Sequence, residues 1–211
     1  MLKRAPLTRA ILVVIALVYV GEIFDAQRML DGGAIIPGLL ASGQYWRLIT
    51  SMFLHAPPSE PYGLGWMHVL ANSWAIFQLG TLYEVLFGSK RFALVYFISG
   101  VCAGIASSLY TNAEAVGASG AVFGLLGAFI FSIWRSPQYR HQRWTKSLLG
   151  QIVFWTVLNL YIGSQFPFVD NVAHIGGLVA GLLLGFIPHR VPPPSPASTV
   201  IDVHPYDDGG F

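Results

Sequence analysis

The fold class is decided by residues 117–135, which read GASGAVFGLLGAFIFSIWR. The stretch carries no charged residue before Arg135, which is typical of a helix that crosses a bilayer. Ser119 stands at its head, and His174 lies inside a second apolar stretch further along the chain. A hydroxyl or an imidazole at membrane depth is costly and indicates a functional site. A serine and a histidine are also the parts of a hydrolytic nucleophile, because one attacks and the other takes its proton.

The whole chain has the composition of a membrane protein. Of its 211 residues, 54% are hydrophobic and only 10% are charged, and the mean hydropathy is +0.58. A soluble domain has about 25% charged residues. The net charge is +2, without a basic cluster that would suit nucleic acid, and a single cysteine excludes a disulfide framework. We therefore expect an all-α integral membrane protein whose solvent is the lipid bilayer.

Six apolar stretches come close to the length of membrane-spanning helices, about 20 residues. They lie at residues 7–24, 66–87, 91–111, 119–135, 147–163 and 170–187. The fourth is short, so we expect its first turn, at Ser119, to lie below the membrane surface. We predict one six-helix membrane domain over residues 1–190 and a disordered tail, rich in Pro and Asp, over residues 191–211.

The connection between the first two stretches, residues 25–65, is unusually long. It is too apolar for a solvated linker, and Gly and Pro interrupt it too often for a span. Irregular backbone is tolerated at membrane depth only where protein buries it or water lines it. We therefore expect a partly membrane-embedded first loop.

Basic residues predict the orientation of the six spans. With the N-terminus inside, ten of the twelve Lys and Arg residues lie on the cytoplasmic side, and only Arg28 and Arg47 lie outside. Such an excess is the usual sign of the cytoplasmic face. Both termini are then cytoplasmic, and Ser119 and His174 lie toward the opposite face.

Glycines recur at four-residue intervals within the predicted helices. This spacing lets helix backbones approach closely in lipid. We expect it to bring the fourth and sixth helices together, so that Ser119 meets His174. The glycines of this pattern are Gly80, Gly88, Gly100, Gly104, Gly120, Gly124, Gly177, Gly181 and Gly185.

Ser119 has surroundings that suit a nucleophile. Gly117 and Gly120 remove bulk on both sides and leave room for a substrate backbone. The residue also opens a helix, where unpaired backbone amides and the positive end of the helix dipole face a developing anion. The alternative interpretation is a small residue that aids helix packing, the commoner role of serine in membranes.

His174 is the candidate base. Ala173 and Gly177 keep its helix face free of bulk, so the imidazole can touch a neighbouring helix. As a neutral base it would accept the Ser119 proton and return it to the leaving amine. The alternative is a structural or metal-binding histidine. Asp170, one turn earlier, could pass for a third triad member, but N-capping is the more ordinary role at a helix start.

His68 and Asn72 lie four residues apart on the second predicted helix, and therefore on one face. They could form an oxyanion hole with the backbone amide of Ser119, and one such donor is worth about 10²–10³ in rate. The alternative is a pair of satisfied polar residues at the membrane interface. A metal site could in principle be formed by His55, His68 and His174. Such a site would leave Asn72 and Ser119 without a role. We expect neither a metal nor a cofactor.

These motifs, in this order, resemble those of the rhomboid intramembrane serine proteases. The match covers nearly the whole chain apart from its termini, and five motifs in the right order make a specific signal. They are Trp46-Arg47, His68-x-x-x-Asn72, Gly80-x-x-x-Glu84-x-x-x-Gly88, Gly117-x-Ser119-Gly120 and Ala173-His174-x-x-Gly177-x-x-x-Gly181.

The resemblance implies the compact six-helix bacterial type in an inner membrane, with a Ser119–His174 dyad and no acid. It implies a water-filled cavity open to the outside and substrate transmembrane segments that enter between the second and fifth helices. Arg47 would steady the first loop, and Glu84 would be structural. The alternative function is a non-proteolytic protein that binds client helices, although inactive members of the wider superfamily lose the serine or the histidine.

Three features depart from the family pattern. Phe123 stands where many bacterial relatives carry a tyrosine, so its ring is expected to stack on His174 without offering a hydroxyl. Val169 replaces a glycine that often opens the sixth-helix motif, which predicts looser packing there. The stretch between His55 and His68 is longer than usual, which affects the shape of the first loop.

Overall fold

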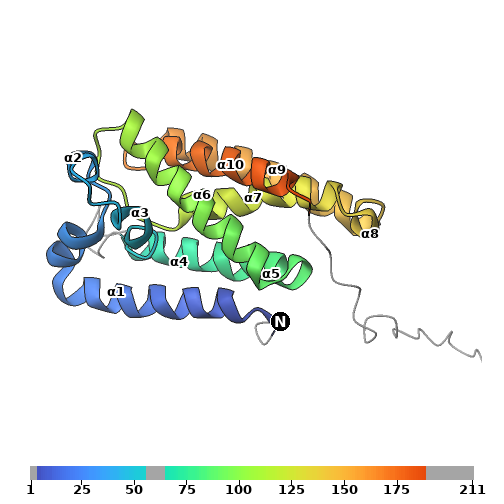
Figure 1. Cartoon of the computed structure of the whole chain (residues 1–211), viewed down its shortest axis with the longest axis horizontal. Helices are drawn as coiled ribbons and strands as arrows, with labels where there is room; N and C mark the ends of the chain where they lie inside the picture. The colour runs from blue at the N-terminus through green and yellow to red at the C-terminus, as the bar shows by residue number, and fades with distance from the viewer. Residues whose placement is uncertain (1–3, 56–64, 189–211) are drawn as a thin grey trace, which may run out of the picture.

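The computed structural model describes residues 4–55 and 65–188, and these form a bundle of helices (Figure 1). The helical segments are α1 (Pro6–Gly33), α2 (Pro37–Ala41), α3 (Arg47–Thr50), α4 (Gly65–Ala75), the π-helical η2 (Ile76–Gly80), α5 (Thr81–Phe87), α6 (Ser89–Tyr110), α7 (Ser119–Trp134), α8 (Pro137–Arg140), α9 (Arg143–Ser164) and α10 (Asn171–Phe186). The described β pairing is one isolated antiparallel bridge between Ile35 and Ala115. The all-α prediction is therefore confirmed for this part of the chain.

Every predicted span coincides with helix. Within the described residues, the three helices α1, α6 and α9 are long and apolar enough to cross a membrane by length and composition. The apolar helices α7 and α10 have 16 residues each, about 24 Å, which is short of the roughly 30 Å of a hydrocarbon core. The segments α4, η2 and α5 follow one another without a break. The number of six spans stays a prediction, and the predicted tail lies outside the described residues.

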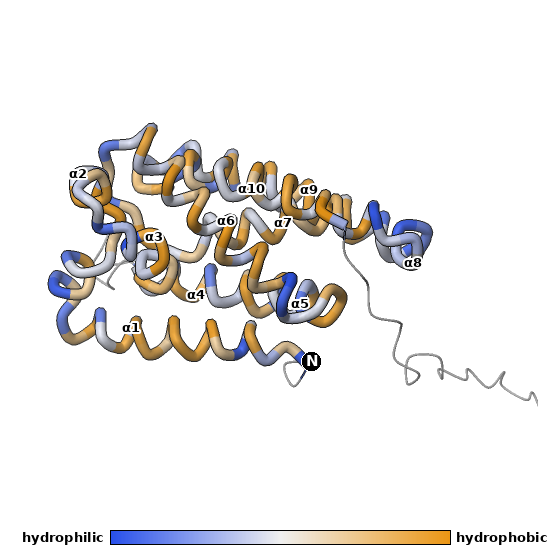
Figure 2. The backbone as a smooth tube through the Cα atoms, viewed as in Figure 1, coloured by the Kyte–Doolittle hydropathy of each residue, from blue (hydrophilic) through white to orange (hydrophobic). Residues whose placement is uncertain are grey.

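The outer surface of the bundle suits lipid. Figure 2 shows hydrophobic residues along the lengths of the helices and hydrophilic ones gathered at the two ends, near the end of α1 and at α8. Large apolar side chains such as Leu17 and Phe24 on α1 and Val157 and Tyr161 on α9 are exposed. Because an apolar surface of this extent is unfavourable in water, lipid covers these faces.

The first helix is longer than predicted. It continues to Gly33 after a kink at Asp25, whose φ of −151° and ψ of 73° are not helical. The Asp25 carboxylate accepts a hydrogen bond from the Arg28 amide at 3.2 Å, as an N-cap residue does, so a second helical stretch starts there. The prediction that the loop begins at residue 25 is therefore wrong, because residues 25–33 are still part of α1.

The rest of the first loop packs into notches on α6. A Cβ added to Gly104 would lie 2.7 Å from Cδ1 of Ile35 and 3.0 Å from Cδ2 of Leu48. At Gly100 the side chain of Met52 fills the same kind of space. The glycine spacing predicted that Gly100 and Gly104 pack against another membrane-spanning helix. That prediction is wrong, because side chains of the first loop fill the space beside both glycines.

Helices α7 and α10 pack backbone to backbone. A Cβ on Gly177 would collide with the carbonyl oxygen of Gly120, and one on Gly181 would collide with that of Gly124. Such contacts leave no room for any side chain at the crossing. The predicted approach of the fourth and sixth helices is therefore confirmed.

Gly80 and Gly88 share a motif but differ in role. A Cβ on Gly80 would lie 3.2 Å from both Thr8 Cγ2 and Phe92 Cε2, so Gly80 lets α1 and α6 approach. A Cβ on Gly88 would meet nothing within 4 Å, and the φ of Gly88 is +83°. It ends α5 in a conformation that favours glycine, so a packing role for Gly88 is wrong.

Candidate active site

Helix α7 begins at Ser119 with an open N-terminus. Ala118 precedes it and provides no side-chain cap. The first backbone bond of the helix runs from the Val122 amide to the Ala118 carbonyl at 3.0 Å. Among the described residues, the amides of Ser119, Gly120 and Ala121 are left without a partner. They face outward at the positive end of the helix dipole, where an anion is stabilised.

The first loop holds the segment ahead of Ser119. Ile35 and Ala115 exchange two backbone hydrogen bonds, of 2.9 and 3.0 Å. The amide of Gly117 donates to the carbonyl of Ser51 at 2.9 Å. The position of Ser119 is therefore coupled to that of the first loop.

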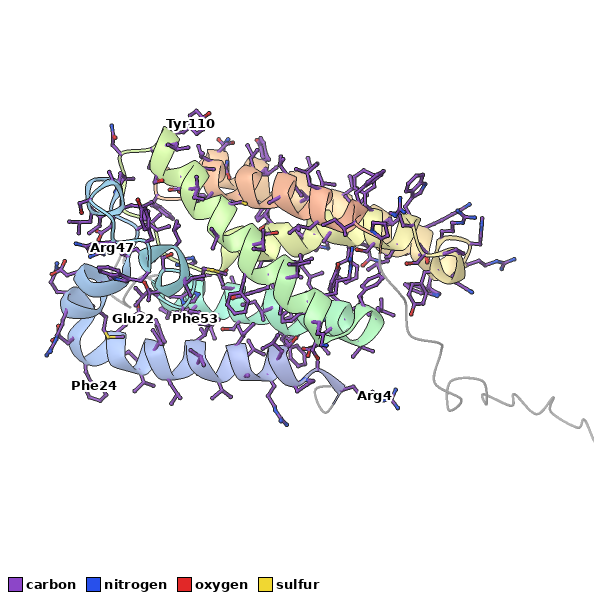
Figure 3. All side chains as sticks on the ribbon, viewed as in Figure 1. Arg4, Glu22, Phe24, Arg47, Phe53 and Tyr110 are labelled. Carbon is purple, nitrogen blue, oxygen red and sulfur yellow. The ribbon has the colours of Figure 1, made fainter. Side chains whose placement is uncertain are left out.

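Arg47 of the first loop lies close to the end of α1 (Figure 3). Arg47 is buried, 3% exposed, and its guanidinium donates to the carbonyl oxygens of Asp31 and Ala34 at 2.7 Å each. The indole of Trp46 donates to the carbonyl of Gly32 at 3.3 Å. These bonds pair carbonyl groups that the irregular backbone would otherwise leave unsatisfied.

Gly117 brings His68 of α4 against the segment ahead of Ser119. A Cβ on Gly117 would lie 2.8 Å from both Cε1 and Nε2 of His68, and 3.9 Å from Nδ2 of Asn72. The φ of Gly117, +117°, is also one that residues with a side chain rarely adopt. His68 and Asn72 thus face the start of α7 from one side of α4, as their spacing predicts.

His174 of α10 lies against the first turns of α7. It is buried, and its ring stacks on Phe123 with centroids 4.3 Å apart and planes 9° apart. Phe123 lies one turn beyond Ser119, so the stack holds the imidazole beside that turn. The predicted Phe123 stacking is confirmed.

Asn171 orients the imidazole. Its Oδ1 lies 3.2 Å from Nδ1 of His174. Because an amide oxygen only accepts, Nδ1 carries the proton in this assignment and Nε2 keeps a free lone pair. Nδ2 of Asn171 donates to the carbonyl of Leu160 at 2.9 Å, which fixes the direction of the amide. Sequence reasoning gave Asn171 no such role, although its i−3 spacing from His174 was an available signal.

Asp170 caps α10. One carboxylate oxygen accepts from the amide of Ala173 at 2.9 Å, and the other accepts from the hydroxyl of Ser107. Both oxygens are therefore engaged away from the imidazole. The expected capping role of Asp170 is confirmed, and a triad role is not supported.

Ser119 and His174 lie on facing first turns. A Cβ on Gly120 would lie 3.6 Å from the carbonyl oxygen of Ala173, so the two helix starts are in contact. Within residues 4–55 and 65–188, no hydrogen bond joins the Ser119 hydroxyl to the His174 ring, whose Nδ1 contact is to Asn171. Catalytic hydrogen bonds of this kind often tighten only when substrate binds.

Val169 does not loosen the start of α10. A Cβ on Gly163 would lie 2.9 Å from Cγ1 of Val169 and 2.5 Å from Oδ1 of Asn171. Gly163 of α9 therefore makes the room that the valine needs. The prediction of looser packing at Val169 is wrong.

Glu84 lies at the opposite end of the bundle from Ser119. It is 2% exposed and accepts from the amides of Leu7 and Thr8 at 3.0 and 2.8 Å, from the Thr8 hydroxyl at 2.7 Å and from the Ser89 hydroxyl at 2.6 Å. It thereby pairs the first amides of α1, which has no side-chain cap, and joins α1, α5 and α6.

Two histidines, His55 and His68, are in contact near the start of α7. The rings of His55 and His68 meet edge to face, with centroids 5.2 Å apart. Within the part of the chain that the structure describes, no three His, Cys, Asp or Glu residues are grouped to hold a metal ion. The rest of the unusually long stretch between these two histidines, residues 56–64, lies outside the described residues.

Comparison with known proteins gives a consistent result. Residues 42–191 match the family model described as Rhomboid domain. The chain is 32% identical over 157 residues to the rhomboid protease GluP of Bacillus subtilis (strain 168). The aligned region covers 74% of this chain and 29% of GluP. The chain is also 35% identical over 150 residues to YdcA of the same strain, which is likewise named a rhomboid protease. This alignment covers 70% of this chain and 69% of YdcA.

A plant relative matches to a similar degree. The chain is 39% identical over 145 residues to RHOMBOID-like protein 1 of Arabidopsis thaliana, which covers 68% of this chain and 34% of that protein. The chain thus spans only 29% and 34% of the lengths of GluP and of the plant protein.

Proposed function

Because the chain belongs to the rhomboid family, we propose that it is a serine-type endopeptidase that cleaves transmembrane segments of other proteins within the bilayer. One observation carries the proposal. His174, with its Nδ1 engaged by Asn171 and its ring stacked on Phe123, lies beside the open N-terminus of the helix that Ser119 begins. A base with a free lone pair, a hydroxyl and unpaired amides are what acyl transfer requires.

The reaction follows from these groups. The Ser119 hydroxyl oxygen attacks the peptide carbonyl carbon while Nε2 of His174 takes the hydroxyl proton. The resulting oxyanion accepts hydrogen bonds from the open amides at the start of α7 and from the side chains of His68 and Asn72. His174 then returns the proton to the leaving amine, and the acyl-enzyme is hydrolysed by water that His174 activates in the same way.

The proposal extends to the arrangement in the membrane. We assign six spans, with both termini in the cytoplasm of a bacterium and the site opening to the outer face of the inner membrane. The distribution of Lys and Arg supports this orientation. Substrate helices would enter between α4 and α9. Gly117 makes room for the His68 ring and Gly120 for Ala103 of α6, so the expectation that they leave room for a substrate backbone is wrong, whereas Gly177 and Gly181 would hold α10 against α7.

Substitution of the two catalytic candidates tests the proposal. Purified protein in liposomes is given a model transmembrane substrate and, separately, a fluorophosphonate probe that labels active serines. We expect Ser119→Ala and His174→Ala to abolish cleavage, and Ser119→Ala to abolish labelling, with an unchanged thermal midpoint. Ser108→Ala, which removes an exposed hydroxyl on α6, serves as the control and should keep both activities.

The same experiment separates a protease from a protein that only binds client helices. A binding protein would take no probe label on Ser119 and would leave the substrate intact in the unsubstituted form. Full cleavage by Ser119→Ala would overturn the assignment of the nucleophile.

A further inference from the structure

Glu22 is a buried carboxylate in the middle of a lipid-facing helix. It is 1% exposed, and in Figure 3 it points from α1 toward the segment that carries Phe53, whereas Phe24 points away from the bundle. Carboxylates at membrane depth are costly unless they are paired, and they are a sign of function. Oε1 of Glu22 accepts from the backbone amide of His55 at 2.8 Å, while Oε2 is buried without a partner among the described residues.

His55 is the last described residue of the first loop, and it is completely buried. Its Nδ1 lies 3.2 Å from the carbonyl oxygen of Phe53, so Nδ1 carries the proton in this assignment. Burial, and then the neighbouring His68, lower the pKa of the His55 imidazole, so the ring is neutral. Its Nε2 has no partner in the described ranges, which leaves ring packing as the main contact of this imidazole.

The packing partner of His55 is the candidate oxyanion donor. The rings of His55 and His68 meet at 5.2 Å with an interplanar angle of 61°. On its other side, His68 lies against Gly117, within 2.8 Å of the position of a Cβ there. A continuous series of contacts therefore runs from Glu22 on α1 through His55 and His68 to the segment that leads into Ser119.

We propose that Glu22 is a positioning residue, which fixes His55 at the end of the first loop so that the His55 ring holds His68 in its place beside Gly117. This inference rests on the proposed role of His68 as an oxyanion donor. The carboxylate anchors the backbone of His55, the neutral ring of His55 sets one edge of the space for His68, and Gly117 sets the other. A shift of His68 by a fraction of an ångström would weaken its bond to the oxyanion more than its contact with bound substrate.

A double-mutant cycle between Glu22 and His68 tests this role, with kcat and KM measured on a transmembrane substrate in liposomes. We expect Glu22→Ala to lower kcat about 10-fold or more with KM within about 3-fold. Glu22→Gln keeps the acceptor oxygen for the His55 amide and should stay within about 3-fold of the parent protein. In a His68→Ala background, which retains Asn72 and the helix amides, Glu22→Ala should lower kcat by less than about 3-fold.

Thr8→Ala is the matched control on the same helix. Thr8 lies at the other end of α1 from Glu22, and its substitution removes the 2.7 Å hydrogen bond from the Thr8 hydroxyl to Glu84 of α5. We expect a lower thermal midpoint but a kcat within about 3-fold of the parent, with or without His68. An effect of Glu22→Ala on kcat that is equally large in both backgrounds, or a lower midpoint with kcat unchanged, would overturn the positioning role.

Two further measurements keep the test decisive. If Glu22→Ala does not fold, His55→Gln takes its place in the cycle, because it keeps the backbone amide and removes the ring. It should lower kcat in the parent and not in the His68→Ala background, and an equal loss in both would refute the inference. Cleavage that does not depend on Ser119 would overturn the proposed function instead, so the two failures are distinguishable.

Discussion

Replacement of Gly117 by alanine tests whether the position of His68 matters for the reaction at Ser119. The added Cβ would lie 2.8 Å from two atoms of the His68 ring, whereas ordinary contact begins at 3.4 Å, so the ring must retreat by about 0.6 Å. A misplacement of about 1 Å can cost about 10²-fold, and loss of one oxyanion donor costs about 10²–10³-fold. We therefore expect kcat to fall about 10²-fold, with KM within about 3-fold, because the lost bond strengthens only in the transition state.

The same substitution also strains the backbone, and a control must separate the two effects. Gly117 has a φ of +117°, at which a side chain costs about 1–3 kcal/mol. Gly43 has a comparable φ of +99°, but a Cβ there would meet nothing within 4 Å. Gly43→Ala should therefore lose similar stability and keep its kcat.

The assay is cleavage of a model transmembrane substrate in liposomes, with a thermal midpoint measured for each variant. If the Gly117 variant is folded and keeps kcat within about 3-fold of the parent, the ring contact has no part in catalysis. If Gly43→Ala loses as much rate as Gly117→Ala, backbone strain explains the loss and His68 does not.

Two further substitutions test the surroundings of His174 and the helix crossing. Asn171→Ala removes the acceptor of the His174 Nδ1 proton, and we expect kcat to fall about 10–10²-fold in the same cleavage assay; an unchanged kcat would show that the amide does not orient the base. Gly181→Ala directs a methyl group at the Gly124 carbonyl and should destabilise the bundle by about 1–3 kcal/mol in a denaturation experiment. Gly150→Ala, on α9 with nothing within 4 Å, should be neutral or slightly stabilising, and equal midpoints for these two variants would contradict the packing argument.

The positions of the helices could be predicted because lipid leaves the backbone few choices. A membrane-embedded chain must pair its amides and carbonyls within helices, so an apolar stretch of sufficient length predicts a helix directly. The end of α1 could not be predicted in this way. The predicted span stops at residue 24, whereas α1 continues to Gly33, and the span includes Glu22, whose carboxylate is costly in hydrocarbon. Glu22 is nevertheless buried, because it pairs with the amide of His55, which is 33 residues away, and no local pattern contains that information.

Glycine spacing predicted where backbones come close, but not what comes close to them. Gly124 and Gly100 both carry the small-residue pattern, yet Gly124 meets the helices α6, at Ser99, and α10, whereas Gly100 meets Met52 of the first loop. Gly88 belongs to the same pattern and serves only a turn, with a φ of +83°. The partner of a small residue depends on how distant segments are arranged, and the spacing within one helix carries no record of it.

The geometry around Ser119 depends as much on irregular segments as on helices. The amide of Gly117, two residues before Ser119, is paired with the carbonyl of Ser51, and Arg47 pairs the carbonyls that hold the first loop in place. Because Arg47 is buried, breaking these bonds would leave buried polar groups unpaired, which costs more than it would at a solvated surface. A change that frees the first loop therefore acts on the start of α7 through Gly117, and the loop is part of the machinery that positions Ser119.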